Sequence, residues 1–169
     1  MRTYEELSKN ELRDLLNRSW MTHDAMWFYN SVLAIGIDKT NPINRAAVKS
    51  MAQVEAKRIK NALGFGDISS FSDLKSFLEN GFEVLRGEFM KFELSFPEKN
   101  RLHWEIPGCF AYEGVKALGV IDGYECGIFD RAHGWFEALG VKYEMKPCVR
   151  KCLMHMDGKC SVDFMFSFD

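Results

Sequence analysis

The residues best suited to chemistry in this chain are its cysteines, three of which lie in the closing stretch PCVRKCLMHMDGKCSVDF. Cys148 and Cys152 are separated by three residues, and a turn containing Gly158 separates them from Cys160. Zinc prefers thiolate and imidazole ligands in a tetrahedron, and the fold commonly brings them together from short local groups. A loop of this kind between two strands is able to gather three sulfurs.

Two further cysteines, Cys109 and Cys126, fall near the starts of predicted helices, where the helix dipole lowers the pKa of a thiol. The sequence therefore predicts a metal site, with zinc as the first choice and iron as the alternative metal. Its ligands are expected to be the following four thiolates: Cys109, Cys126, Cys152 and Cys160. Either Cys148 or His155 is an alternative to one of them.

The competing interpretation of the same cysteines is purely structural. Cysteine is among the most buried residue types and fills gaps as a small hydrophobe. The chain has no doubled C-x2-C pair of the kind found in zinc ribbons, and C-x3-C is not the C-x2-C of a redox motif. Both interpretations stay open at the level of the sequence.

The composition of the chain indicates the cellular compartment and the kinds of partner that we expect for this protein. The N-terminus has no apolar segment of the signal-peptide kind, and no window reaches a membrane-spanning length. We therefore expect a reducing cytoplasm, where five cysteines, an odd number, argue against a disulfide framework. A net charge of −2 and a pI near 6.1 predict neither a nucleic acid nor a membrane as partner. A small-molecule ligand is the expected partner, and a homodimer formed through exposed aromatics is a further expectation.

A second candidate site lies on the first predicted helix. His23 shares an apolar stripe with Leu16, Trp20 and Trp27, so it is expected either as a core histidine or as a ligand or general base in a pocket. Its neighbour Asp24 is grouped with it as a catalytic candidate.

Glu55 falls on the apolar stripe of the second predicted helix, with Arg58 beside it, and Trp104 lies on the apolar face of a predicted hairpin. Buried carboxylates need partners. We therefore expect a cluster of His23, Asp24, Glu55 and Arg58, with Trp27 and Trp104 as walls of a ligand pocket. The alternative is a buried helix–helix salt bridge with no ligand.

These residues are carried by an expected α+β fold, a small antiparallel sheet covered by helices. Residues 1–169 are predicted as a single domain, with a helical part at 1–81 and a ββααββ part at 82–169. Ser8 and Glu11 form a capping box for the first helix. The second helix is expected from Asn41, with Pro42 at its first position, to Gly64, and the third ends at Gly81.

The β pattern begins at FMKFELSF, which alternates apolar and polar residues, and returns after the turn PEKN in RLHWEI. Helices are expected at 109–119 and 123–140. Strands follow at 141–145 and 161–168, and the last strand is expected to place Val162, Phe164, Phe166 and Phe168 on one face.

The last third of the chain resembles the 4-vinyl reductase family of small-molecule-binding domains. The matching features are Cys126 with Gly134 on a helix, then Cys152, Gly158 and Cys160, and finally VDFMF. The resemblance implies a ligand pocket near the sheet and a zinc site at Cys126, Cys152 and Cys160, to which Cys109 is our addition. Asp130 stands where that family's helix usually has a small residue, and Cys148 is extra.

The first half resembles an uncharacterised prokaryotic family related to L-2-amino-thiazoline-4-carboxylate hydrolases. The resemblance rests on HDAMWF and EAKRIKNALG. Two functions follow as expectations. The first is a sensor-like or accessory small-molecule-binding domain with a zinc site. The alternative is a hydrolase of a small cyclic amide-like or amino-acid-derived compound, with His23 as base and Cys126 or a metal-bound water as nucleophile.

Overall fold

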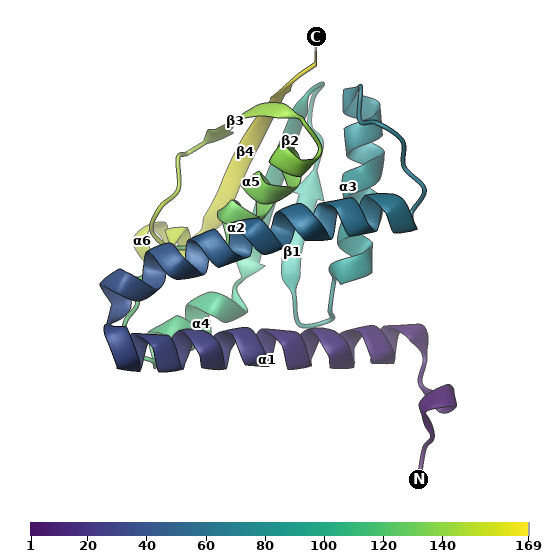
Figure 1. Cartoon of the computed structure of the whole chain (residues 1–169). Helices are drawn as coiled ribbons and strands as arrows, with labels where there is room; N and C mark the ends of the chain where they lie inside the picture. The colour runs from purple at the N-terminus through teal and green to yellow at the C-terminus, as the bar shows by residue number, and fades with distance from the viewer. Residues whose placement is uncertain (169) are drawn as a thin grey trace.

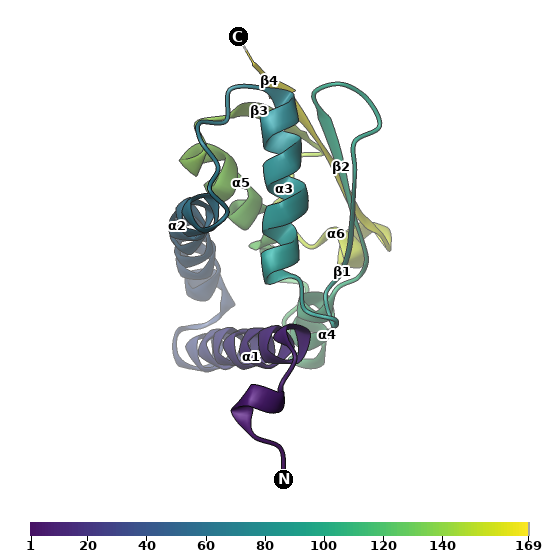
Figure 2. The same cartoon turned by 90° about the vertical axis from the view of Figure 1, so that its right-hand side faces the viewer.

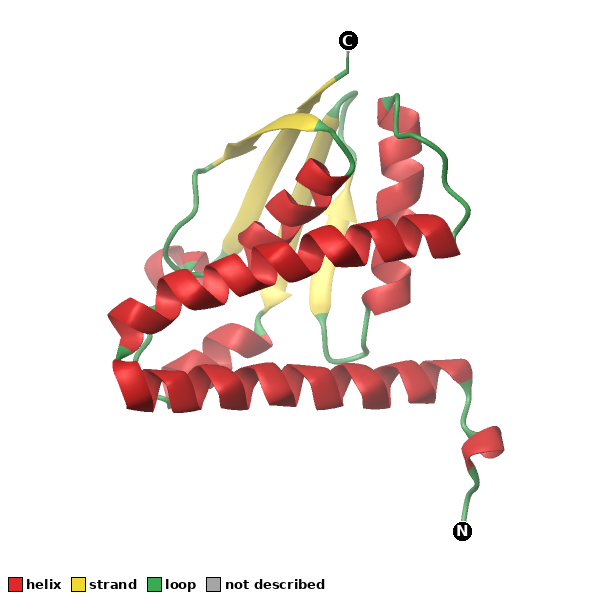
Figure 3. Ribbon diagram, viewed as in Figure 1, coloured by secondary structure: helices red, strands yellow, loops and turns green. Residues whose placement is uncertain are grey.

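The structure of the protein is a computed structural model in which residues 1–168 are described, so the last residue of the predicted domain lies outside the described residues. Figure 1 shows the elements, which in chain order are η1 (Tyr4–Glu6), α1 (Lys9–Ile35), α2 (Ile37–Ala62), α3 (Phe71–Leu85), β1 (Lys91–Ser95), β2 (Arg101–Gly108), α4 (Phe110–Ala117), α5 (Ile128–Ala138), β3 (Lys142–Lys146), α6 (Leu153–Asp157) and β4 (Cys160–Ser167). The longest helices come first, and the strands follow with shorter helices between them (Figure 3), which confirms the predicted α+β class.

The described strands form one antiparallel sheet in the order β1-β2-β4-β3. In the two central strands every second side chain is buried, so one face of the sheet is apolar and the other polar. The register places Trp104 of β2 opposite Val162 of β4 and opposite Leu94 of β1. The predicted hairpin and the predicted buried face of the last strand are both confirmed.

The apolar face of the sheet is covered by α3 and α5, and α2 lies on the far side of α5 (Figure 2). Aromatic rings fill the interface. Trp135 of α5 stacks on Phe82 of α3 at 4.9 Å between ring centroids, and Phe136 packs edge-on against Phe164 of β4 at 5.1 Å. The core therefore lies between the sheet and α5, with α2 as an outer cover.

The first helix, α1, forms a separate layer below the rest of the molecule and runs alongside α4 in Figure 1. Ser8 accepts a hydrogen bond from the Glu11 backbone and Glu11 bonds back to the Ser8 backbone, so the predicted capping box is confirmed. α1 ends at Ile35 and is capped by Gly36, whose φ of +80° lies in a region that favours glycine. Among residues 1–168, no helix combines the length and apolar character needed to cross a membrane.

Three predicted helix boundaries are wrong for identifiable reasons. α2 begins at Ile37, directly after Gly36, and Asn41 lies inside it. The Asn41 amide donates to the Gly123 carbonyl at 2.8 Å and its side-chain oxygen accepts from the Glu125 backbone at 3.1 Å, so this residue ties α2 to a distant loop instead of capping the helix.

Gly81 does not end α3, which continues to Leu85. A Cβ at Gly81 would lie 3.2 Å from the ring of Trp135, so this glycine provides room for packing. The helix predicted from residue 123 begins only at Ile128, because residues 123–127 form a turn and a bridge to Lys151. A short helix, α6, occupies part of the loop expected between the last two strands.

Candidate functional site

A cavity of about 370 Å³ lies between α1 and the end of the domain formed by α4, α5 and the hairpin. Aromatic and aliphatic side chains make up most of its wall. Its lining includes Trp20, Met21, Asp24, Ala25, Phe28, Tyr29, Val48, Met51, Phe82, Leu85, Phe92, Trp104, Ile106, Cys109, Phe110, Tyr112, Val115, Tyr124, Cys126, Arg131, Trp135 and Cys152. Pockets of this size and character are typical of small-molecule sites.

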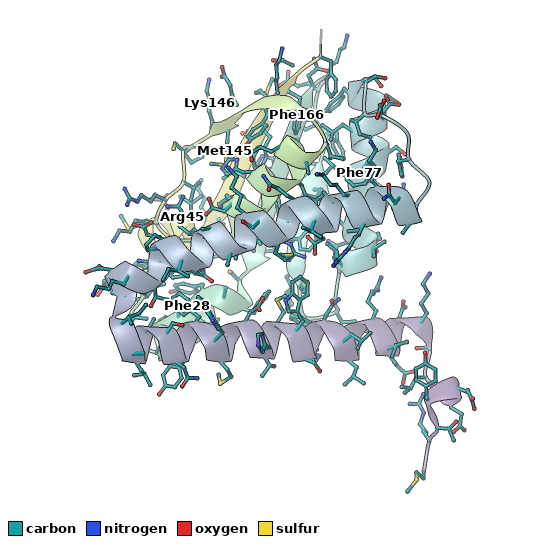
Figure 4. All side chains as sticks on the ribbon, in the orientation of Figure 1. Phe28, Arg45, Phe77, Met145, Lys146 and Phe166 are labelled. Carbon is teal, nitrogen blue, oxygen red and sulfur yellow. The ribbon has the colours of Figure 1, made fainter. Side chains whose placement is uncertain are left out.

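α1 supplies one wall of the cavity through residues spaced three and four apart, which share one helical face. They are Trp20, Met21, Asp24, Ala25 and Phe28. Phe28 projects from α1 toward the body of the molecule (Figure 4) and meets Tyr124 edge-on, with 5.6 Å between ring centroids. The Asn17 amide donates to the Leu85 carbonyl at 2.8 Å, which fixes the other half of α1 to the end of α3.

Trp104 forms part of the opposite wall, and its ring is almost fully buried, with 3% of its surface exposed. Its indole is surrounded by four phenylalanine rings, with centroids between 5.2 and 6.5 Å away: Phe82, Phe92, Phe129 and Phe164. Among the described residues, its Nε1–H has no hydrogen-bond acceptor. Trp104, predicted as a ligand-binding residue, therefore lies at the cavity with a donor unused.

Glu55 is buried as predicted, but its partner is not Arg58. Arg131 of α5 donates to both carboxylate oxygens of Glu55, at 2.9 and 2.7 Å, and the Trp135 indole adds a third hydrogen bond at 2.8 Å. Arg58 is exposed. The expected cluster of His23, Asp24, Glu55 and Arg58 is therefore not formed. The salt bridge instead links α2 to α5, and only its arginine lines the cavity.

The apolar stripe expected to be buried on α1 lies largely outside. Leu16 is 60% exposed and Trp27 40% exposed, and the side chain of His23 is 78% exposed. His23 and Trp27 line a shallow groove on the outer side of α1, whereas Asp24 lines the main cavity. The His23 Nδ1 lies 3.6 Å from an Asp24 oxygen. The catalytic roles of His23 and Asp24 stay predictions. His23 lies on the outer side of α1, whereas Cys126 lines the main cavity on the other side of that helix.

The four cysteines proposed as ligands come together at one end of the sheet. Ile106 of β2 pairs with Cys160 of β4, and Cys109 follows β2 directly. The Cys126 backbone N–H donates to the Arg150 carbonyl at 2.9 Å, which brings Cys126 beside the segment that leads into Cys152. Cys148 is exposed.

The pKa values of the thiols reflect this gathering. Burial raises the pKa of Cys126, and neighbouring thiolates at Cys109, Cys152 and Cys160 would raise it further. Burial raises the pKa of Cys160 to about 12, with Cys109 and Cys152 acting in the same direction. Buried thiols that weaken one another's ionisation are protonated and unreactive unless a cation offsets the charge.

This donor set has the chemistry that zinc prefers, because four thiolates are a common structural zinc site. Among residues 1–168, however, no three His, Cys, Asp or Glu side chains are arranged to hold an ion. Zinc binding would require the four sulfurs to move closer together and lose their protons. His155 is engaged elsewhere, with its Nε2 2.9 Å from an Asp122 oxygen.

The sequence did not predict several residues of the cavity. Tyr124 and Arg131 were missed, and so was the contribution of Phe28. Tyr124 lies in a turn and Arg131 follows an ordinary helical pattern, so neither carries a local signal of a binding site. Phe28 was detectable only as one of several apolar residues around α1.

The fold and cavity together define a small α+β domain with an aromatic-walled pocket beside a group of thiols. The chain belongs to a family of unknown function, DUF6125, whose model matches residues 5–120. The match covers α1 to α4 and the hairpin, but α5 and the cysteines Cys126, Cys152 and Cys160 lie beyond it. No curated protein and no solved structure matches the chain. The resemblances to vinyl reductases and thiazoline hydrolases therefore stay predictions.

Proposed function

We propose that this protein is a small-molecule-binding domain with a sensor-like or accessory role, and that its ligand lies in the cavity beneath α1. The observation that carries the proposal is the cavity of about 370 Å³ with its aromatic wall. Apolar surface facing such a space gains free energy when a ligand covers it, at about 25 cal/mol per Å². A cytoplasmic location, where the thiols stay reduced, is part of the proposal.

The proposal is tested by filling the cavity. Ala25 lines the cavity on α1, and Ala34, nine residues further along, lies two and a half turns away on the opposite side of the same helix. Naphthalene titrated into ¹⁵N-labelled protein is expected to shift amide signals of α1, α4 and β2. Ala25→Trp should weaken binding at least about tenfold, whereas the matched control Ala34→Trp should leave it unchanged.

Two outcomes of this titration would contradict the proposed ligand site. A wild-type protein that shows no shifts up to the solubility of naphthalene contradicts the proposal. Equal affinity in the wild type and a folded Ala25→Trp variant also contradicts it, because the ligand would then lie somewhere other than the cavity.

We further propose that Cys109, Cys126, Cys152 and Cys160 hold a structural zinc ion at the edge of this cavity. The thiols' effect on one another's pKa supports this proposal, since it reflects their proximity. A bound ion would supply the positive charge that lets buried thiols ionise. The role would be structural, because four protein ligands leave no open position for water.

Metal analysis tests the zinc proposal. Protein prepared without chelator and under reducing conditions is expected to carry stoichiometric zinc. Cys160→Ser should lose the metal, and Cys148→Ser, at an exposed cysteine, should retain it. Zinc-free wild-type protein from zinc-supplemented cells would overturn this proposal without affecting the cavity.

No observation supports a hydrolase function as well as the cavity supports ligand binding. The proposed base, His23, lies on the outer side of α1, and burial raises the pKa of the proposed nucleophile Cys126. A general base must come within hydrogen-bond reach of the proton that it removes. Hydrolase activity is therefore not part of the proposal.

A further inference from the structure

We propose that the ligand of the cavity is an apolar carboxylate, whose apolar body lies inside the cavity and whose negative end pairs with the Lys91 ammonium at the rim. This inference rests on the proposed function, since it names the class of molecule that the cavity would bind. It also assigns Lys91 the recognition of the charged end.

Lys91 belongs to the wall of the cavity on the side of the hairpin. It is the first residue of β1 and pairs with Gly108 at the end of β2, and both residues line the cavity. The Lys91 stem lies along this wall, because its Cδ is 3.5 Å from the position that a Cβ at Gly108 would occupy.

The cavity meets solvent at this point. Lys91 is exposed, and Phe110, which also lines the cavity, is 45% exposed. A long cationic side chain commonly lies with its stem on apolar surface and its charge in water. The Lys91 ammonium is therefore expected at the rim, where a ligand's charged end would keep part of its hydration.

The fold leaves the charge of Lys91 unpaired. The charged residues that line the cavity, within the part of the chain that the structure describes, are Asp24, Lys91 and Arg131. Arg131 donates to both carboxylate oxygens of Glu55, and Asp24 has the His23 Nδ1 3.6 Å away. Among residues 1–168, the Lys91 ammonium has neither an ion-pair nor a hydrogen-bond partner.

The charges of the wall favour a single negative charge on the hairpin side. One unpaired ammonium matches a carboxylate, which carries one charge at neutral pH, better than a phosphate monoester, which carries almost two. Asp24 on the α1 wall would repel an anion, so the carboxylate is directed toward Lys91. A carboxylate buried deeper would lose its hydration without a free cation to replace it.

The size of the cavity limits the apolar body. An apolar cavity of roughly 150 Å³ holds one benzene ring, so a cavity of about 370 Å³ has room for about two rings. Covering the aromatic wall supplies most of the binding free energy. The ion pair at the rim then selects among molecules that have a similar apolar body.

The test compares two probes that share a shape and differ in charge. 2-Naphthylacetate carries a carboxylate, and 2-naphthylacetamide carries a neutral amide in its place. Each is titrated at pH 7.5 and low salt into the ¹⁵N-labelled wild type, into Lys91→Met and into the matched control Lys99→Met. Lys99 is exposed in the turn of the same hairpin and does not line the cavity, so its loss changes the net charge equally.

The preference for the carboxylate is measured as the ratio of the two dissociation constants. It is expected to fall about threefold to fivefold in Lys91→Met and to stay unchanged in Lys99→Met, as the loss of a partly exposed ion pair predicts. Lys91→Arg, which keeps the charge, should retain the preference. Raising the salt to about 0.5 M should reduce it in the wild type, because salt screens exposed charges.

The outcomes separate this inference from the proposed function. If both probes bind and the ratio is the same in the wild type and Lys91→Met, Lys91 does not recognise the ligand, while the cavity proposal stands. An equal fall in Lys99→Met would also overturn the inference, since net charge alone would then explain it. If neither probe binds the wild type, the proposed function fails first.

Discussion

Glu55 and Arg131 join α2 to α5 through two parallel hydrogen bonds of 2.9 and 2.7 Å, with both side chains mostly shielded from water. Removing one partner of such a pair leaves the other charge uncompensated, at a cost of about 3 kcal/mol. We therefore expect Glu55→Gln to lower the free energy of unfolding by about that amount in urea denaturation.

The matched control is Glu137→Gln, because Glu137 pairs with Lys49 between the same two helices but in a solvent-exposed position. Exposed pairs contribute about 0 to 1 kcal/mol. Equal losses in the two variants would show that the buried position of the Glu55 pair carries no extra stability.

Gly134 marks the closest approach of α5 to α2. A Cβ at this position would lie 2.6 Å from the Lys49 carbonyl oxygen and 2.7 Å from the Ala52 Cβ, both in the adjacent helix. Gly134→Ala is therefore expected to push the helices apart and destabilise the protein by about 1–3 kcal/mol in thermal or urea unfolding.

A Cβ at Gly114 in α4 would meet nothing within 4 Å. Gly114→Ala should be neutral or stabilising by up to about 1 kcal/mol, because alanine favours the helix. Similar unfolding curves for the Gly134 and Gly114 variants would contradict the packing argument.

His133 gives the fold a pH dependence. Burial lowers the pKa of His133 below its usual value of 6.5, so the unfolded chain takes up a proton at higher pH than the folded chain does. Stability from this residue is therefore present above pH 6.5 and is lost as the pH falls toward the folded-state pKa. His133→Asn should flatten this loss in urea titrations between pH 7.5 and 5.5, and equal slopes would refute the assignment.

The cysteines are expected to react with a maleimide in two classes. Cys148 is exposed, whereas burial raises the pKa of Cys160 from 9.0 to about 12. Three pKa units reduce the reactive thiolate about 1000-fold, apart from the steric protection. Mass spectrometry of folded, metal-free protein should show a single fast-labelled site, and Cys148→Ser should remove it. Rapid labelling of Cys160 would contradict its buried position.

Local patterns were sufficient to predict most elements of the fold. The Ser8–Glu11 box and the alternation in the hairpin depend only on neighbouring residues. The predicted helix boundaries were wrong where contacts with residues distant in the sequence determine the role of the boundary residue. Asn41 resembles a helix cap, but it binds Gly123 and Glu125 from within α2. Gly81 resembles a helix stop, but it accommodates Trp135.

The site was harder to predict because its contacts are long-range. Glu55 was correctly expected to be buried, but its nearest cation in sequence, Arg58, is exposed, and its actual partner is 76 residues away. On α1, apolar residues occur around the whole helix, so periodicity did not identify the inward face. Trp104 was expected at the cavity because strand alternation determines which side its ring occupies.

The attachment of α1 has a mechanical consequence. The helix joins α2 at Gly36 without an intervening loop, and its first half is tied down by a few peripheral bonds, such as Asn17 to the Leu85 carbonyl and Asp14 to the Glu88 backbone. Swinging outward about that glycine would uncover the cavity without disturbing the sheet. How quickly a guest molecule enters and leaves would then be governed by the lifting of one helix, and the rigid part of the domain could remain closed throughout.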